Sequence, residues 1–177
     1  MLDVILLTYE KSYLYNFIMY KILILLFYLI NNICFSFDYE IQTHAKRTII
    51  KTIPISETKK YISFILEGTW TDNLGNYGMM EQSSFVMLDN NDVIELDGYG
   101  KTIYQNNQET YFRGYRNRQE KDSGVGETKI VNATVELSSL IGMKCPYAVN
   151  FFNDTAYAFA KCKITEEQKK ILSKISQ

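Results

Sequence analysis

The segment Cys145–Cys162 constrains the fold more than any other part of this sequence. Its two cysteines flank Asn153-Asp154, and asparagine tolerates the positive φ angle that a two-residue hairpin loop requires. A loop at these residues places Cys145 opposite Cys162 at a non-hydrogen-bonded pair of antiparallel strands, where Cα atoms lie about 4.5 Å apart. Because a disulfide accepts that separation, the sequence predicts a β-hairpin closed by a Cys145–Cys162 disulfide.

The same register pairs large side chains with small ones on the face that carries the sulfurs. The pairs are Tyr147 with Ala160, Val149 with Ala158 and Phe151 with Ala156. A large side chain opposite a small one fills an inner face without voids. The pattern therefore indicates a hairpin with one buried face.

Upstream of this hairpin, short segments with strand character alternate with turn signals. The segments are 61–68, 83–88, 93–96, 101–105, 110–116 and 128–136, with turns at 72–76, 89–92 and 106–107. Strands at a spacing of about ten residues, without helical periodicity between them, are typical of an antiparallel barrel or sandwich. We expect a mainly β fold, with a closed antiparallel β-barrel of about seven or eight strands favoured over the sandwich.

The end of the chain has a different pattern. Thr165–Gln168 matches a capping box, and Ile171, Leu172 and Ile175 share one face of a helix. The sequence therefore predicts a short C-terminal helix at about 165–175. We expect this helix to pack on the barrel wall or over one mouth.

The residues before the strands have the pattern of a secretory signal peptide. Lys21 supplies a short basic region, an unbroken apolar run covers 22–30, and Cys34 and Ser36 occupy the −3 and −1 positions of a plausible cleavage site. This order predicts cleavage after Ser36 and export of the protein, which would be periplasmic or secreted.

Two domain boundaries follow from this interpretation. Residues 1–36 form a hydrophobic signal helix, in which 1–18 is interpreted as an extension from a start codon assigned too early, and 37–177 form a single β-barrel domain. The alternative is a membrane anchor through 19–36. The apolar run is about half of the ~18–20 residues that cross a bilayer, so we expect no stable membrane span after cleavage.

Charge and cysteine content bear on the function classes. The chain carries 19 Lys and Arg against 20 Asp and Glu, a net charge of −1, without the basic clustering typical of nucleic-acid binding. Cleavage would remove Cys34 and leave Cys145 and Cys162, an even number that favours a disulfide in an exported chain. These two cysteines and His44 fall short of four zinc ligands. We therefore expect no nucleic acid, no metal and no cofactor.

The segment Gly68–Gly78 contains the only tryptophan, Trp70, and several turn residues. It resembles the first-strand segment of avidin-like barrels, where a G-x-W-x-N-x-L-G pattern ends a strand and opens a turn, although Asp72 stands at the Asn position of that pattern. The biotin pocket of that family uses several tryptophans. The resemblance therefore implies the barrel architecture rather than the ligand.

A wider resemblance is to small exported bacterial proteins of unknown function with calycin-like or with dirigent and allene-oxide-cyclase-like barrels. It rests on Gly68–Gly78, on Leu140–Val149 and on the closing Cys162. Such proteins often carry a further cysteine pair after the tryptophan segment, and 79–91 contains none. This resemblance implies a fold and little chemistry.

Three residues are the candidate ligand-binding residues: Trp70, Tyr77 and Arg113. Arg113 is one of three arginines, with Arg116 and Arg118, that could bind an anionic group. The alternative interpretations are a barrel-wall role for the tryptophan and solvated strand ends for the arginines. The sequence contains no phosphate-binding loop, nucleophile elbow or His-Glu metal motif, so catalytic residues stay unassigned and the balance is against an enzyme.

Three functions are compatible with these features. The first is an exported barrel that binds a small apolar or amphipathic ligand in its interior. The second is a cyclase or isomerase resembling allene oxide cyclase. The third is a structural envelope or interaction protein with a packed core. An apolar hollow favours the first, a hollow with a buried carboxylate or a water-binding polar group the second, and a filled interior the third.

Overall fold

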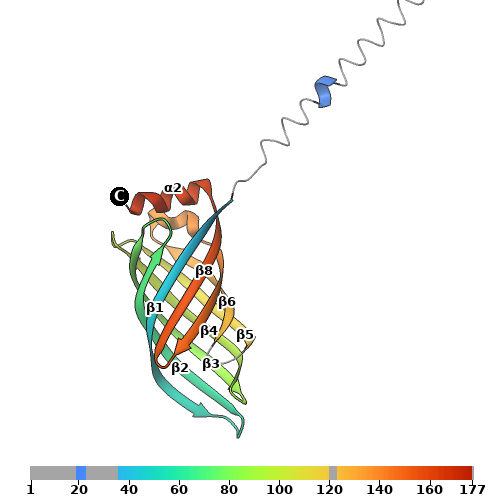
Figure 1. Ribbon diagram of the computed structural model, residues 1–177, viewed down its shortest axis with the longest axis vertical. Helices are drawn as coiled ribbons and strands as arrows, with labels where there is room; N and C mark the ends of the chain where they lie inside the picture. Colours follow the sequence, from blue (N-terminus) through green and yellow to red (C-terminus); the bar gives the residue numbers. More distant parts are fainter. Residues whose placement is uncertain (1–18, 23–35, 120–122, 177) are drawn as a thin grey trace, which may run out of the picture. The chain divides into compact units, whose positions relative to one another are not determined.

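The computed structural model describes residues 19–22, 36–119 and 123–176, and all of its strands belong to the unit that begins at Ser36. In this unit eight antiparallel strands follow each other around a closed barrel, and the last strand pairs with the first (Figure 1). The expected mainly β fold with a closed barrel and a C-terminal helix is confirmed. The strands are β1 Ser36–Pro54, β2 Lys59–Asp72, β3 Tyr77–Asp89, β4 Asp92–Tyr104, β5 Glu109–Gln119, β6 Ser123–Ala133, β7 Lys144–Phe152 and β8 Thr155–Thr165.

The predicted signal peptide lies almost entirely outside the described residues. Of 1–36, only 19–22 and Ser36 are described, so the cleavage site and the extension at 1–18 stay predictions. Among the helices that the structure describes, none is long and apolar enough to cross a bilayer.

The C-terminal hairpin has the predicted register. Tyr147, Val149 and Phe151 pair with the three expected alanines, and Asn153 in the loop has a φ of 54°. Cys145 and Cys162 form a disulfide across a Cα separation of 4.4 Å. Local turn chemistry and side-chain size were sufficient to predict this unit.

Two strands differ from the sequence-based expectation. β1 was not predicted, because its middle places small or polar residues such as Thr43 and Ala45 on the inner face and so lacks a clear apolar alternation. β4 is one strand rather than two. Its glycines do not break it, because Gly98 allows a close strand approach: a Cβ there would lie 2.0 Å from Ser84 Oγ.

The segment after β6 is a further difference. The predicted strand at 128–136 ends at Ala133, and a 3₁₀ helix, η1, follows at Val135–Leu140. Leu137 and Leu140 of this helix are fully buried in the main core. Burial of these two leucines at one end of the barrel explains why the chain leaves the sheet.

The helix α2, Glu166–Ile175, covers one mouth of the barrel together with η1 (Figure 1). Thr165 and Gln168 form the predicted capping box, and Leu172 and Ile175 are buried in the same core cluster as Trp70. We call this mouth the helix end. The opposite mouth, which we call the turn end, carries the β1–β2, β3–β4 and β7–β8 connections.

Candidate ligand-binding cavity

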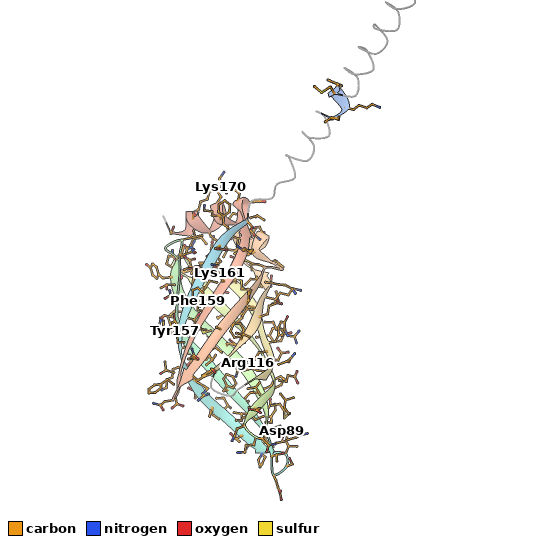
Figure 2. All side chains as sticks on the ribbon, turned by 45° about the vertical axis from the view of Figure 1, so that its right-hand side comes forward. Asp89, Arg116, Tyr157, Phe159, Lys161 and Lys170 are labelled. Atoms are coloured by element: carbon orange, nitrogen blue, oxygen red, sulfur yellow. A yellow bond between two sulfur atoms is a disulfide. The ribbon has the colours of Figure 1, made fainter. Side chains whose placement is uncertain are left out.

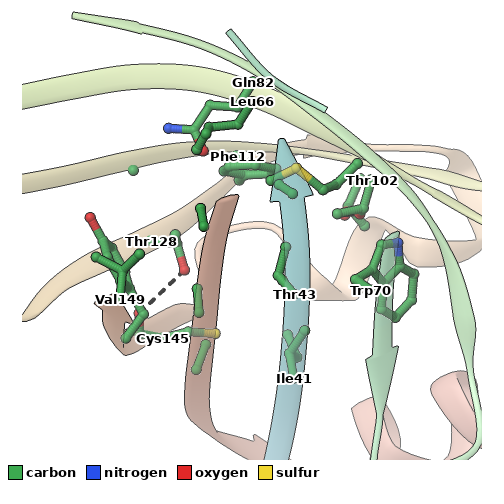
Figure 3. A pocket seen from close by; sticks show the side chains of 18 of the residues that line it. Ile41, Thr43, Leu66, Trp70, Gln82, Thr102, Phe112, Thr128, Cys145 and Val149 are labelled. Carbon is green, nitrogen blue, oxygen red and sulfur yellow. Dashed lines mark hydrogen bonds between the residues drawn. The ribbon is translucent and has the colours of Figure 1, made fainter. Parts of the chain in front are cut away.

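The inward side chains of all eight strands enclose a cavity of about 140 Å³ (Figure 3). Most of its wall is aliphatic or aromatic, including Trp70 and Phe112. Alternate residues of a strand point to the same face, so each strand contributes a short series of wall residues. The polar side chains in the wall are those of Thr43, Gln82, Thr102, Thr110, Thr128, Tyr39, Tyr104 and Tyr147.

The cavity exists because small side chains line two opposite parts of the barrel wall. An eight-stranded barrel has an interior just wide enough for side chains to fill or to hold one small ligand. Here Thr43, Ala158 and Ala160 line the cavity on β1 and β8, and Gly114 lines it on β5. These small residues leave the space between the two parts of the wall unfilled.

Trp70 forms part of the cavity wall toward the helix end. Its indole is 2% exposed, and its Nε1–H donates to the backbone carbonyl of Met79 at 3.1 Å. The ring meets Tyr104 edge to face, with centroids 4.6 Å apart. One polar and one aromatic contact thus fix the indole, which presents apolar surface to the cavity.

A hydrogen-bond network around Asp72 closes the helix end. Its carboxylate accepts from Tyr39 Oη at 2.7 Å, from Asn76 Nδ2 at 2.8 Å and from the backbone amides of Leu74 and Asn76 at 2.9 and 2.8 Å. Asn76 Nδ2 also donates to the carbonyl of Leu172 in α2. Asp72 therefore joins the β2–β3 turn, the start of β1 and the covering helix.

Two buried phenols beside this network resist ionisation. Burial raises the pKa of Tyr104 to about 12 and raises the pKa of Tyr39 well above its usual value. Because an unfolded tyrosine ionises near pH 10, the unfolded chain loses these protons first as the pH rises. The contribution to stability is present below pH 10 and is lost as the pH rises through the folded pKa.

We therefore expect the free energy of unfolding to fall by about 1 kcal/mol per buried phenol between pH 9 and pH 11. Urea unfolding of the wild type and of Tyr104→Phe at both pH values measures the effect of one phenol. The variant should lose less stability over this interval than the wild type, whereas Tyr157→Phe, a change at an exposed position, should behave as the wild type. Equal losses in all three proteins would contradict the burial argument.

The other two candidate residues lie outside the cavity. Tyr77 is 58% exposed at the start of β3. Arg113 is on the outer face of β5, where it forms a bidentate ion pair with Asp97 and lies between the rings of Tyr99 and Tyr115. This ion pair lowers the pKa of the Asp97 carboxyl. Of the three sequence candidates, the structure brings only Trp70 to the cavity.

Arg116 is the functional candidate that the sequence arguments did not separate from Arg113. Arg113 and Arg116 are separated by an odd number of positions on β5, so their side chains point to opposite faces. Arg116 shares the inner face with Phe112 and Gly114 and is 3% exposed. The side chain of Arg118 lies outside the described residues. The alternation of side chains along a strand is the signal that could have distinguished the two arginines.

A second cavity, of about 90 Å³, lies toward the turn end. Arg47 and Arg116 line it, and it shares Phe64, Leu96 and Phe151 with the larger cavity. Arg47 Nη2 donates to the carbonyl of Asn153 at 2.8 Å, and its guanidinium lies 4.7 Å from the Phe151 ring centroid. The two cavities therefore adjoin each other at these three apolar side chains.

The described residues contain no group of three or more His, Cys, Asp or Glu side chains that could hold a metal ion. His44 lies on the outer face of β1, with its ring 4.9 Å from that of Tyr157. The wall of the larger cavity, as far as the structure describes it, contains no carboxylate. The arrangement can bind an apolar body and offers hydroxyl, amide and guanidinium groups to polar atoms.

A scan against protein-family models finds none that matches this chain, and a search of curated proteins finds none that is significantly similar to it. The fold and the cavity define a class, a closed eight-stranded antiparallel barrel with an internal apolar cavity. The functional argument therefore depends on the geometry of the barrel interior.

Proposed function

We propose that this protein is an exported β-barrel that binds one small apolar or amphipathic molecule in its interior. The observation that carries the proposal is the cavity of about 140 Å³ with its mostly apolar wall. An apolar cavity of about 150 Å³ in another protein takes up benzene or xenon. A ligand with one ring or a chain of about six carbons is of comparable size.

Two further observations support parts of this proposal. Export is supported by the signal-peptide pattern before the barrel and by the Cys145–Cys162 disulfide, since disulfides persist in oxidising compartments. A binding role is favoured over the cyclase or isomerase alternative because most of the described wall of the larger cavity is apolar, and its polar side chains are hydroxyl and amide groups rather than a carboxylate. The unfilled cavity favours a binding protein or an enzyme over a structural protein with a packed core.

Titration with two neutral probes, hexan-1-ol and benzyl alcohol, tests whether the interior binds a ligand. We expect both probes to bind the wild type saturably when the titration is measured by protein NMR. Ala158→Leu adds three carbon atoms at the cavity wall and should weaken binding of both probes at least tenfold, by occupying the space they need. The matched control is Tyr157→Leu at the neighbouring, outward position, which should leave the affinity within twofold of the wild type.

The outcomes separate the binding hypothesis from the alternatives. Absence of saturable binding to the folded wild type would contradict the proposal and favour a packed structural role. Binding that Ala158→Leu leaves unchanged would place the site outside the barrel and also contradict it. Circular dichroism and the melting temperature of each variant establish that the comparison is made between folded proteins.

A further inference from the structure

We propose that the interior ligand is anionic, with its apolar body in the larger cavity and a carboxylate bound by Arg116 toward the turn end. The inference rests on the proposed function, because it names the chemical class of the molecule that the same barrel would bind. Its starting point is the position of one cation: Arg116 lies inside the barrel, 3% exposed, in the half nearer the turn end (Figure 2).

A buried guanidinium is an unusual wall residue for an apolar interior. Burial of a charge is costly, so a buried arginine keeps polar or anionic partners, and Arg116 has such an interaction within the protein. A guanidinium has five N–H donors in a planar fork, so it can hold a carboxylate through two parallel hydrogen bonds while it keeps other partners. Arg116 therefore provides the donor geometry that a carboxylate head group requires.

The position of Arg116 along β5 connects it to the larger cavity. Gly114, two residues earlier on the same inner face, lines that cavity and has no side chain to separate it from the arginine. A Cβ at Gly114 would only reach ordinary contact, 3.5 Å from Gln82 Nε2. Tyr147 lies in the wall of the same cavity. Burial raises the pKa of the Tyr147 phenol, and the nearby charge of Arg116 opposes this increase.

The charge of the smaller cavity favours the same type of ligand. Its described lining contains two cations, Arg47 and Arg116, and no acidic side chain. The remaining lining residues are apolar, and three of them, Phe64, Leu96 and Phe151, also border the larger cavity. An amphipathic anion that spans the two cavities would place its chain against apolar side chains and its charge beside the cations.

The test compares two probes with the same six-carbon chain, hexanoate and hexan-1-ol, by isothermal titration calorimetry at pH 7. We expect the wild type to bind hexanoate at least tenfold more tightly than hexan-1-ol, since hydrogen bonds between charged groups contribute more than neutral ones. Arg116→Met keeps an unbranched side chain at the position and removes the cation. It should weaken hexanoate binding at least tenfold and change hexan-1-ol binding less than twofold.

Arg113→Met is the matched control, because it removes an arginine from the outer face of the same strand. It should leave the affinity for both probes within twofold of the wild type. Arg116→Lys keeps the charge without the planar fork and should give an intermediate loss for hexanoate. If Arg113→Met weakens hexanoate binding as much as Arg116→Met does, the anion binds outside the barrel and the proposal is wrong.

A second measurement uses the wild type alone and does not depend on the folding of Arg116→Met. In a ¹³C NMR titration of carboxyl-labelled hexanoate, a neighbouring guanidinium should lower the pKa of the bound carboxyl below the pKa of free hexanoate. An unshifted titration would overturn the proposal. Equal affinities for both probes would also overturn it while the proposed interior binding stands, whereas binding of neither probe would contradict the proposed function itself.

Discussion

Replacement of Asp72 by alanine is expected to lower the free energy of unfolding by about 3 kcal/mol or more. The carboxylate accepts hydrogen bonds from Tyr39, from the Asn76 side chain and from two backbone amides of the β2–β3 turn. Its removal leaves the phenol of Tyr39 and the buried amide of Asn76 without this acceptor, and each buried group deprived of a partner costs about 1–3 kcal/mol. Urea denaturation followed by circular dichroism measures the loss.

Two matched variants show whether the network carries this effect. Asp72→Asn keeps the shape of the side chain and one carbonyl oxygen, so we expect a smaller loss than for alanine. Asn73→Ala, at the exposed neighbouring position, removes two hydrogen bonds to β1 and should cost about 1 kcal/mol. A loss below 1 kcal/mol for Asp72→Ala would show that the network does not hold the helix end closed.

Removal of the disulfide is expected to have an effect of similar size. The bridge closes a loop with a sequence separation of 17, for which the chain-entropy model gives about 3 kcal/mol. For a domain of this size such a loss lowers the melting temperature by about 10 °C. The double variant Cys145→Ala, Cys162→Ala and the reduced wild type should show this decrease in differential scanning calorimetry.

The same experiment has a chemical control. Quantification of thiols in denatured but unreduced protein, with mapping of the peptides, should find Cys145 and Cys162 joined. Two free thiols at these positions in protein from an oxidising compartment would contradict the disulfide. An unchanged melting temperature after complete reduction would contradict its expected contribution to stability.

The hairpin and the turns could be predicted because their information is local. Asn153, Asn107 and the pair Asn90-Asn91 all have positive φ angles in two-residue or short turns, as expected for asparagine at such positions. The capping box at Thr165 is equally local. In each case a few adjacent residues determine the backbone conformation, so a single sequence is sufficient.

The strands β1 and β4 depend on information that is not local. The inner face of β1 includes Thr43 and Ala45, which are small or polar residues that line the cavity, so its apolar alternation is weak. Gly98 in β4 is required by the approach of Ser84 on the neighbouring strand. These residues become interpretable only when the strand partners are known.

The candidate site shows the same division. Trp70 was identified because it is the only tryptophan and lies in a recognisable turn segment. The predicted strand 110–116 already places Arg113 and Arg116 on opposite faces, but which face points into the barrel is known only from the packing of the strand. Connectivity places α2 at the mouth where β8 ends, and Asn76 and Gln105 hold it there by hydrogen bonds from distant turns to its carbonyl groups.

A crystal of the protein under xenon pressure shows whether the barrel contains an apolar cavity that a small molecule can enter. Xenon binds in apolar cavities of this size without requiring any particular polar group. We expect a xenon site inside the barrel, within the walls that include Trp70, Phe112 and Val149. An interior without xenon, in which the side chains from opposite walls meet and fill the space, would contradict this expectation.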